Sequence, residues 1–177
     1  MKIGIISDIH GDLFNLKSAF EELSRQEIKL VLVLGDVLYH GPRNPMPEGY
    51  NPMGVATLIN EASFNFVFVK GNCDAEVDNF VIRYPLLQEF SYVYVDGIGI
   101  LMNHGDRFED AEQILQHFKN IDILLTGHTH IPVIEETPFG THINPGSISL
   151  PKGGSKKSFA ILDVENGKFF VEFKEIP

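Results

Sequence analysis

The chain has 177 residues, 44% of them hydrophobic, and its 14 Lys and Arg against 24 Asp and Glu give a net charge of −10. This length allows one domain with a full core, and we expect residues 1–177 to form a single domain. The acidic charge disfavours nucleic acid as a partner, because non-specific affinity for DNA comes from Lys and Arg side chains that contact phosphates.

The sequence also indicates where the protein works. No apolar run approaches the roughly 20 residues of a membrane helix, so we expect no membrane segment. The apolar start of the chain is interrupted by Ser7 and Asp8 and lacks the small-residue cleavage pattern of a signal peptide. Cys73 is the only cysteine, which excludes an internal disulfide. These features together predict a cytoplasmic protein.

The first half of the chain alternates predicted strands and helices. Short apolar runs bounded by turn residues predict strands buried in a sheet. Asp12 is the expected N-cap of a helix, since Leu13, Leu16, Phe20 and Leu23 recur at helical spacing. The predicted order is a strand ending at residue 7, this helix, a strand at 29–34, a helix at 54–61 and a strand at 64–69. Four prolines and two glycines rule out regular structure in residues 41–52.

The second half is rich in predicted hairpins. The dipeptides Asp96-Gly97 and Asn166-Gly167 are strong signals for two-residue hairpin turns. The predicted elements are strands at 91–95 and 98–103, a helix marked by residues 111–118, a strand at 121–126, and hairpins formed by 131–136 with 141–144 and by 159–164 with 169–173. This mixed order predicts an α/β fold, a two-sheet β-sandwich flanked by helices in four αββα layers.

Seven candidate metal ligands lie where these predicted strands end. They are Asp8, His10, Asp36, Asn72, His104, His128 and His130. Because open α/β sheets bind ligands beyond the carboxyl ends of their strands, we expect the seven side chains to meet at one rim. Oxygen and imidazole donors suit divalent metals such as Mn, Fe, Zn or Mg. Two such ions would make the rim locally positive, so that a small phosphate ester could bind to an acidic protein.

Each of these motifs also has an ordinary structural interpretation. Asp8 could cap a turn, and Gly35-Asp36 is a common turn dipeptide. A single histidine such as His104 is more often partly buried with a satisfied ring. His128 and His130, however, stand two residues apart after an apolar strand, where paired histidines have few structural uses. The occurrence of all the motifs at strand ends favours a metal site.

The motifs resemble, in order, those of the calcineurin-like metallophosphoesterases. They are Asp8-Ile9-His10, Gly35-Asp36, Gly71-Asn72, His104-Gly105 and Gly127-His128-Thr129-His130. Two further segments, Asn144-Pro145-Gly146-Ser147 and His40-Gly41-Pro42-Arg43-Asn44, make the chain most similar to the small bacterial YfcE-type phosphodiesterases of this superfamily. The resemblance covers essentially the whole chain.

The resemblance implies a centre with two divalent metal ions and a hydrolase of small phosphate diesters. Asp8, His10 and His130 would hold one ion, Asn72, His104 and His128 the other, and Asp36 would bridge them. Mn²⁺ is the expected metal, with Fe, Zn, Ni, Co or Mg as alternatives. A water shared by the ions would attack phosphorus as hydroxide, so no protein nucleophile is needed.

Two neighbours of Asn72 are further candidates for a catalytic role. Many members of the superfamily have His after the Gly-Asn pair as a general acid, whereas this chain has Cys73. Asp74, which orients that His in the family, has no imidazole beside it. We interpret Cys73 as an altered catalytic position and keep a small buried filler as the alternative. Asp36, Asn72 and His104 complete the predicted catalytic set.

Arg43 and Asn72 are the candidates for binding the substrate. Arg43 lies seven residues after Asp36 on an irregular loop, and arginine can grip phosphate oxygens with a two-pronged fork. A solvent-facing arginine is the alternative. The run Lys152-Gly153-Gly154-Ser155-Lys156-Lys157 lacks the spacing of a phosphate-binding loop and is expected to be a mobile turn.

Several features stay open at this level. His40 and His142 could support the site or could simply be exposed. Pro85-Leu86-Leu87 could complete the core or form the interface of a homodimer or homotetramer. Two rival functions are a phosphomonoesterase and a non-enzymatic scaffold like the retromer subunit of the same fold. The complete ligand set argues against the scaffold, and the short chain together with Cys73 argues against a protein phosphatase.

Overall fold

The computed structural model describes residues 1–108 and 110–176, which form two five-stranded sheets with helices on their outer faces. The first sheet has the order β10-β9-β1-β2-β3, and the second has the order β4-β5-β6-β8-β7. The strands are β1 (Lys2–Ile6), β2 (Leu30–Val33), β3 (Asn65–Phe68), β4 (Ser91–Val95), β5 (Ile98–Met102), β6 (Ile123–Leu125), β7 (Pro132–Thr137), β8 (Gly140–Pro145), β9 (Ser158–Glu165) and β10 (Lys168–Glu175). The helices are α1 (Leu13–Arg25), α2 (Pro52–Glu61), α3 (Ala111–Leu115) and the 3₁₀ helix η1 (Glu76–Phe80).

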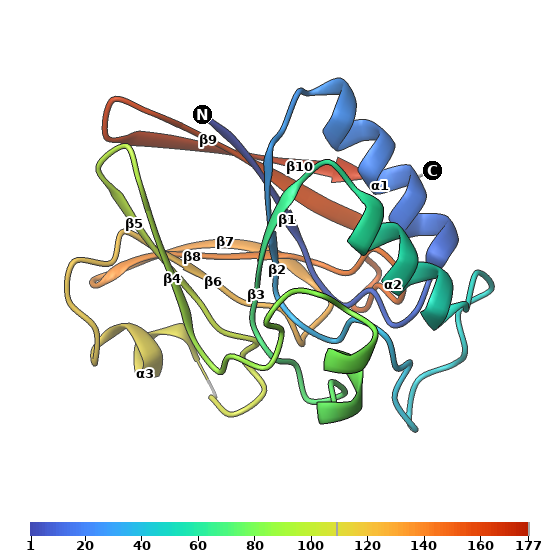
Figure 1. Ribbon diagram of the computed structural model, residues 1–177. Coiled ribbons are helices and arrows are strands. Elements are labelled where there is room, and N and C mark those ends of the chain that lie inside the picture. The colour runs from blue at the N-terminus through green and yellow to red at the C-terminus, as the bar shows by residue number, and fades with distance from the viewer. Residues whose placement is uncertain (109, 177) are drawn as a thin grey trace.

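Each sheet contains three adjacent parallel strands. β1, β2 and β3 run parallel in the first sheet, and β5, β6 and β8 run parallel in the second. β4 forms a hairpin with β5, and β7 forms one with β8. Both β4 and β7 are antiparallel edge strands of the second sheet. In Figure 1 the carboxyl ends of β1, β2, β3 and β5 all lie in the lower part of the molecule, where the loops that follow these strands come together.

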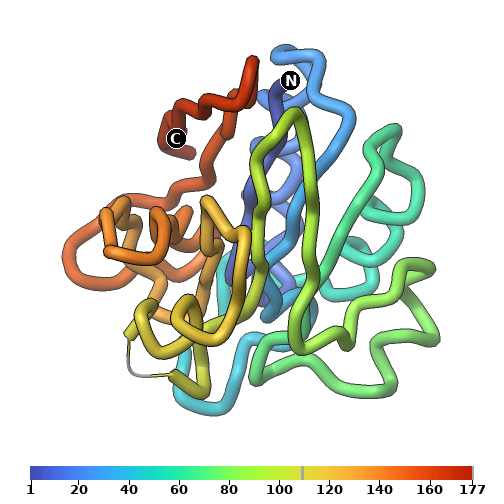
Figure 2. The backbone as a smooth tube through the Cα atoms, turned by 90° about the vertical axis from the view of Figure 1, so that its left-hand side faces the viewer, coloured from blue at the N-terminus to red at the C-terminus, as the bar shows by residue number. Residues whose placement is uncertain are grey.

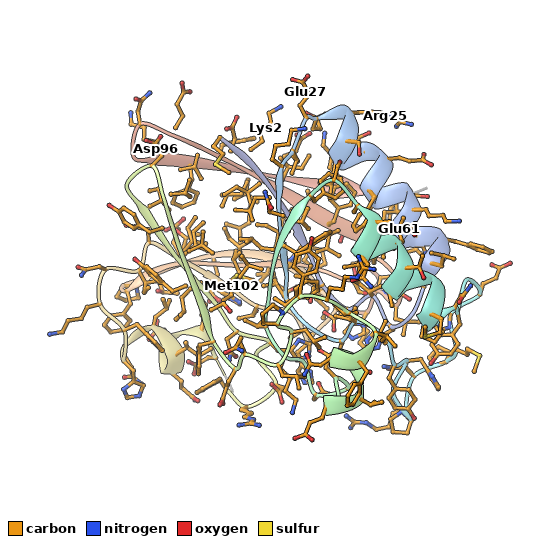
Figure 3. The ribbon with its side chains drawn as sticks, in the orientation of Figure 1. Lys2, Arg25, Glu27, Glu61, Asp96 and Met102 are labelled. Atoms are coloured by element: carbon orange, nitrogen blue, oxygen red, sulfur yellow. The ribbon has the colours of Figure 1, made fainter. Side chains whose placement is uncertain are left out.

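The sheets pack face to face, which confirms the predicted αββα sandwich. α1 and α2 lie outside the first sheet, and α3 lies on the far side of the molecule, against the second sheet (Figures 1 and 2). Side chains from both sheets fill the layer between them, including Ile5, Leu32, Ile100 and the Met102 labelled in Figure 3. Among the described residues, no helix has both the length and the apolar character needed to cross a membrane.

Capping residues explain where the two long helices begin. The Asp12 carboxylate accepts a hydrogen bond from the Asn15 backbone N–H at 3.1 Å, so the predicted N-cap of α1 is confirmed. α2 begins at Pro52, two residues before the predicted start. Asn51 caps it by accepting from the Gly54 N–H at 2.9 Å, and proline is well tolerated at the first helical position.

Other differences from the prediction are local. The 3₁₀ helix η1 was not predicted. α3 ends at Leu115, so Phe118 lies outside it. Leu86 is fully buried in the core beneath α1 and α2, and Leu87 packs against the same core. Leu86 and Leu87 therefore help to complete the core, whereas Pro85 is exposed.

Candidate metal centre

The seven predicted ligands all lie in loops that follow strands, and the structure brings them together. Asp8 and His10 follow β1, Asp36 follows β2, Asn72 follows β3, His104 follows β5, and His128 and His130 follow β6. Five of them, Asp8, His10, Asp36, His128 and His130, have positive φ angles between 48° and 65°. Left-handed backbone costs roughly 1–2 kcal/mol at a non-glycine residue, and such strain gathers at functional sites.

Two glycines let the loops after β2 and β3 touch. A Cβ added at Gly35 would lie 2.5 Å from the Gly71 backbone nitrogen. A Cβ added at Gly71 would overlap the backbone nitrogen and the carboxylate of Asp36. The glycines of the Gly-Asp and Gly-Asn motifs are therefore needed for close approach, which puts Asp36 and Asn72 side by side.

Backbone carbonyls fix the orientation of three histidine rings. His10 Nδ1 lies 2.8 Å from the Tyr39 carbonyl oxygen, and His104 Nδ1 lies 2.6 Å from that of Leu34. His130 Nδ1 lies 2.5 Å from the carbonyl oxygen of Leu150. Because a carbonyl only accepts, each Nδ1–H donates, and each neutral ring presents the lone pair of Nε2 to the site. Metal-binding histidines are commonly oriented in this way.

The first group of donors consists of Asp8, His10 and His130. The Nε2 atoms of His10 and His130 face each other at 3.3 Å, and Asp8 Oδ1 lies 3.3 Å from His130 Nε2. Asp8 Oδ1 is buried without a hydrogen-bond partner. Two facing lone pairs and an orphaned carboxylate oxygen are unfavourable alone, but they fit a shared cation, whose ligands at ~2.1 Å stand roughly 3–3.5 Å apart.

The second group consists of Asn72, His104 and His128. Asn72 Oδ1 lies 3.2 Å from His104 Nε2 and 2.8 Å from His128 Nδ1. Asp36 lies between the groups, since its Oδ2 is 3.6 Å from His10 Nε2 and its Oδ1 is 3.6 Å from His104 Nε2. Asp36 therefore stands within 3.6 Å of one histidine of each group.

The ionisation of these groups reflects burial and close charges. Burial raises the pKa of Asp36, but the hydrogen bond and charge of His104 outweigh it and hold that pKa well below its usual range. For His104, burial lowers the pKa, but Asp36 and Asp8 outweigh it and raise the pKa to about 9. With a pKa of about 9, the His104 ring would carry a positive charge beside Asp36 at neutral pH when no metal ion is bound.

Cys73 and Asp74 differ in how they relate to the site. Cys73 is half-buried, and its N–H donates to Asp36 Oδ1 at 2.8 Å. Burial and the nearby Asp36 raise the pKa of the Cys73 thiol to about 12. Asp74 is buried and accepts backbone hydrogen bonds from Asp36, Val37 and Gly71 at 2.7–2.8 Å. The structure therefore places Asp74 behind the site, where it ties together the loops after β2 and β3.

The Asn144-Pro145-Gly146-Ser147 segment holds two ligand loops in place. Asn144 donates from its side-chain amide to the Gly127 carbonyl at 2.6 Å, next to His128. The Ser147 hydroxyl donates to the Asp8 carbonyl at 2.8 Å. The motif therefore positions ligands and does not line the cavity. His142, left open by the sequence, lies beside Thr126 with 2.7 Å between its Nε2 and the Thr126 hydroxyl.

A cavity of about 330 Å³ opens over the metal-ligand cluster. Its lining includes the predicted residues Asp36, Arg43, Asn72, Cys73, His128 and His130, together with Lys152. Sequence reasoning missed Lys152 because its glycine-rich run was interpreted only as a turn. A larger cavity of about 630 Å³ lies between α1 and α2, but none of the predicted site residues lines it. The smaller cavity is the candidate active site because it contains the donors.

Comparison with known proteins places this geometry in a family. The profile of the Calcineurin-like phosphoesterase superfamily domain matches residues 1–167. Phosphodiesterase YfcE of Escherichia coli strain K12 is 39% identical over 163 residues, which cover 92% of this chain and 88% of YfcE. A solved structure of the E. coli phosphoesterase YfcE has a TM-score of 0.83 at 38% identity, covering 92% of this chain and 88% of that chain.

A more distant neighbour shares the fold alone. Vps29 of Chaetomium thermophilum has a TM-score of 0.69 at 19% identity, covering 99% of this chain and 97% of that chain. This likeness shows the fold alone, and the family assignment rests on the sequence profile and the similarity to YfcE. The chain belongs to the calcineurin-like phosphoesterase superfamily.

Proposed function

We propose that the protein is a dinuclear metal-dependent phosphodiesterase that hydrolyses small phosphate diesters. The observation that carries this proposal is that Asp36 lies 3.6 Å from one histidine of each donor group, beneath one cavity. The relative YfcE, a phosphodiesterase, supports diesters as the substrate class. In this proposal the described chain is one catalytic domain.

The proposed division of ligands is the one that the family resemblance implies, and the distances between the donor atoms support it. Asp8, His10 and His130 would hold one cation, Asn72, His104 and His128 the second, and Asp36 both. Divalent cations bound there would supply a water acidified towards neutral pH and would draw charge from the phosphoryl oxygens. We infer Mn²⁺ as the metal, because imidazole-rich sites suit Mn²⁺ and later metals, whereas Mg²⁺ prefers oxygen ligands and retains its waters.

The chain's other residues would bind the substrate and set its leaving group. Arg43 lines the cavity, where its guanidinium can donate two parallel hydrogen bonds to phosphate oxygens. Asn72 lines it too, and its side-chain N–H₂ can donate to the same phosphate. Cys73 occupies the general-acid position of many relatives, but a thiol with a pKa of about 12 donates its proton poorly near neutral pH. Esters whose leaving groups need no protonation should therefore react best.

Specific observations weigh against the rival functions. A non-enzymatic scaffold has no need for strained, correctly oriented metal ligands, yet five of the seven candidate ligands carry left-handed backbone. A phosphomonoesterase acting on alkyl esters would need a proton donor for the leaving group, and the Cys73 thiol is a poor one because of its high pKa. We also infer that the protein acts in the cytoplasm, because a chain with one cysteine and no internal disulfide suits a reducing compartment.

The test is metal removal and reconstitution. Exhaustive chelation should abolish hydrolysis of bis-p-nitrophenyl phosphate, and Mn²⁺ should restore it better than Mg²⁺. Metal analysis of the same samples should give two ions per chain in the active protein. Undiminished hydrolysis by protein shown to hold no metal would rule this mechanism out.

A further inference from the structure

We propose that Lys152 selects the substrate by binding a second phosphate group, one that the diester carries in addition to the reacting phosphate. The proposal rests on the phosphodiesterase function proposed above and names its substrate class. Lys152 lines the same cavity as Asp36 and Arg43, although it lies in a loop that follows β8, far from both in sequence.

Hydrogen bonds fix the backbone of Lys152 to the metal-ligand loop. The Lys152 N–H donates to the His130 carbonyl at 3.2 Å, and the Ser155 N–H donates to the Lys152 carbonyl at 3.1 Å. The Ser155 hydroxyl also donates to the Lys152 carbonyl, at 2.7 Å. His130 is further tied to this loop through its ring, which donates to the Leu150 carbonyl. The expected turn is present, and its hydrogen bonds hold the backbone of Lys152 beside His130.

The two glycines that follow Lys152 make this turn possible. Gly153 and Gly154 have φ angles of +63° and +78°, both left-handed. A β-turn closed by the Lys152 carbonyl with two successive left-handed residues is of the type that favours glycine at both positions. A Cβ at Gly153 would also come within 3.0 Å of Ile131 Cδ1. The Lys-Gly-Gly-Ser run is thus a turn that places one lysine at the cavity.

Arg43 reaches the cavity from a different wall. Its loop packs against Cys73, since a Cβ at Gly41 would lie 3.1 Å from Cys73 Sγ. The Asn44 side chain steadies the loop by donating to the His40 carbonyl at 2.9 Å. The loop that carries Arg43 therefore lies beside Cys73, and the backbone of Lys152 lies beside His130. A guanidinium fork and the metal ions suffice for the reacting phosphate, which leaves Lys152 for a second anionic group.

The charges of the cavity support a substrate with more than one phosphate. Among the described residues that line it, Asp36 is the only carboxylate, and Arg43 and Lys152 take part in none of the ion pairs between described residues. Two divalent ions would outweigh Asp8 and Asp36, and the two side-chain cations add to this excess. A diester with a single negative charge would leave much of this positive charge uncompensated.

The size of the cavity limits where the second phosphate can be. At about 330 Å³ it lies near the lower end of small-molecule sites, which begin at roughly 300 Å³. The net charge of −10 disfavours a long polyanion. The substrate class that fits is a small diester with a second phosphate nearby on the same molecule, such as a mononucleotide diester that carries a further phosphate ester.

The experiment compares two matched substrates on the metal-reconstituted full chain. They are thymidine 5′-(p-nitrophenyl phosphate) with and without a 3′-phosphate. We expect the wild-type kcat/KM to be about tenfold higher for the 3′-phosphorylated substrate, mainly through KM, consistent with one charged hydrogen bond at an exposed site. Lys152→Gln should remove this preference, and Lys152→Arg should keep most of it. The inhibition constants of thymidine 3′,5′-bisphosphate and thymidine 5′-monophosphate serve as a measure of binding. The bisphosphate should bind more tightly to the wild type and to Lys152→Arg, and this difference should be lost in Lys152→Gln.

Lys156→Gln is the matched control, because Lys156 lies in the same loop but pairs with Glu175 at 2.6 Å and does not line the cavity. It should leave the preference unchanged. Equal kcat/KM for both substrates in the wild type, or an unchanged preference in Lys152→Gln, would overturn this inference alone. Failure of the metal-loaded wild type to hydrolyse either substrate would overturn the proposed function on which it rests.

Discussion

Asp36 presents its two carboxylate oxygens to histidines of two different donor groups, at 3.6 Å each. Its carboxylate is nearly fully buried, and the low pKa keeps it charged across the physiological range. A charged group shared in this way is what would hold two cations close together.

Replacing Asp36 by Asn tests this role directly. The amide of the Asp36→Asn variant would offer one neutral oxygen, so we expect bound metal to fall from two ions per chain to one or fewer, and kcat/KM to fall by about 100-fold or more, as when a buried charge partner is lost. The measurements are metal analysis and hydrolysis of an aryl diester. Asp163→Asn, a half-exposed carboxylate paired with the N-terminus, is the control. Two ions per chain with normal turnover in the Asp36 variant would show that Asp36 is not the bridge.

Cys73 follows the Gly71-Asn72 motif, at the position where the family resemblance implies a histidine in many members. Its pKa of about 12 makes it a poor proton donor, and its backbone is tied to Asp36. Asp74 already accepts three backbone hydrogen bonds, so only its remaining lone pairs could orient a ring introduced beside it. The native protein should therefore prefer activated diesters to simple monoesters.

Cys73→His should shift that preference, because an imidazolium with a pKa of ~6.5 donates a proton more readily than this thiol. We expect the monoester-to-diester ratio of kcat/KM to rise by about tenfold, within the usual worth of a general acid. Cys73→Ser, which adds no proton donor of suitable pKa, is the control. The monoester in this ratio is an alkyl ester, whose leaving group needs a proton, and the diester is an aryl ester. The prediction is wrong if the native protein prefers the alkyl monoester, or if the histidine leaves the ratio where it was.

At the scale of elements, the site depends on the close contact between the loops after β2 and β3, which we call the loop crossing. Gly35 and Gly71 permit the contact, and Asp74 closes it with hydrogen bonds to both loops. The strands β2 and β3 are adjacent and parallel, so their carboxyl ends already lie side by side. A small disturbance of this crossing should displace Asp36 and Asn72 together.

Gly71→Ala is the corresponding test. Its Cβ would overlap the Asp36 backbone, and overpacking of this kind costs about 3 kcal/mol of unfolding free energy. Gly154→Ala is the control, because it has left-handed φ but open space around it and should cost about 1 kcal/mol. Denaturant unfolding measures both costs, and metal analysis should show a loss for Gly71→Ala alone. Equal destabilisation of the two variants, with full metal content, would contradict this account of the crossing.

For the whole molecule, the donors come from both sheets. Asp8, His10, Asp36 and Asn72 follow strands of the first sheet, and His104, His128 and His130 follow strands of the second. Metal ions bound between them would therefore link the two halves of the sandwich. Chelation should then destabilise the whole fold as well as abolish activity.

Thermal unfolding with and without Mn²⁺ measures this link. At free Mn²⁺ of about 100 times Kd, each site should add about 2.7 kcal/mol. For a chain of this length, that corresponds to a rise in Tm of at least about 5 °C. Asp36→Asn should show a smaller rise than the wild type, and Asp163→Asn an equal one. A Tm that does not respond to Mn²⁺ in protein shown to bind it would mean that the metals do not join the sheets.

The sequence by itself determined the elements and the donor types. Local apolar runs and turn residues are short-range signals, so the strands and the Asp12 cap could be predicted to within a few residues. The order of these elements along the chain then predicted the two-sheet architecture. The position of each candidate ligand at a strand end could also be predicted, because that relation is local. The resemblance of the five motifs added the family, which the comparisons confirm.

Only the tertiary structure decided what depends on contacts between distant residues. Asp74 holds two loops behind the site, Leu86 fills the core, and Lys152 reaches the cavity beside His130. None of these positions follows from local patterning, because each depends on which strands are neighbours and on how closely two backbones approach. A pattern of single residues specifies what a strand end carries, whereas the packing of the two sheets decides which strand ends meet.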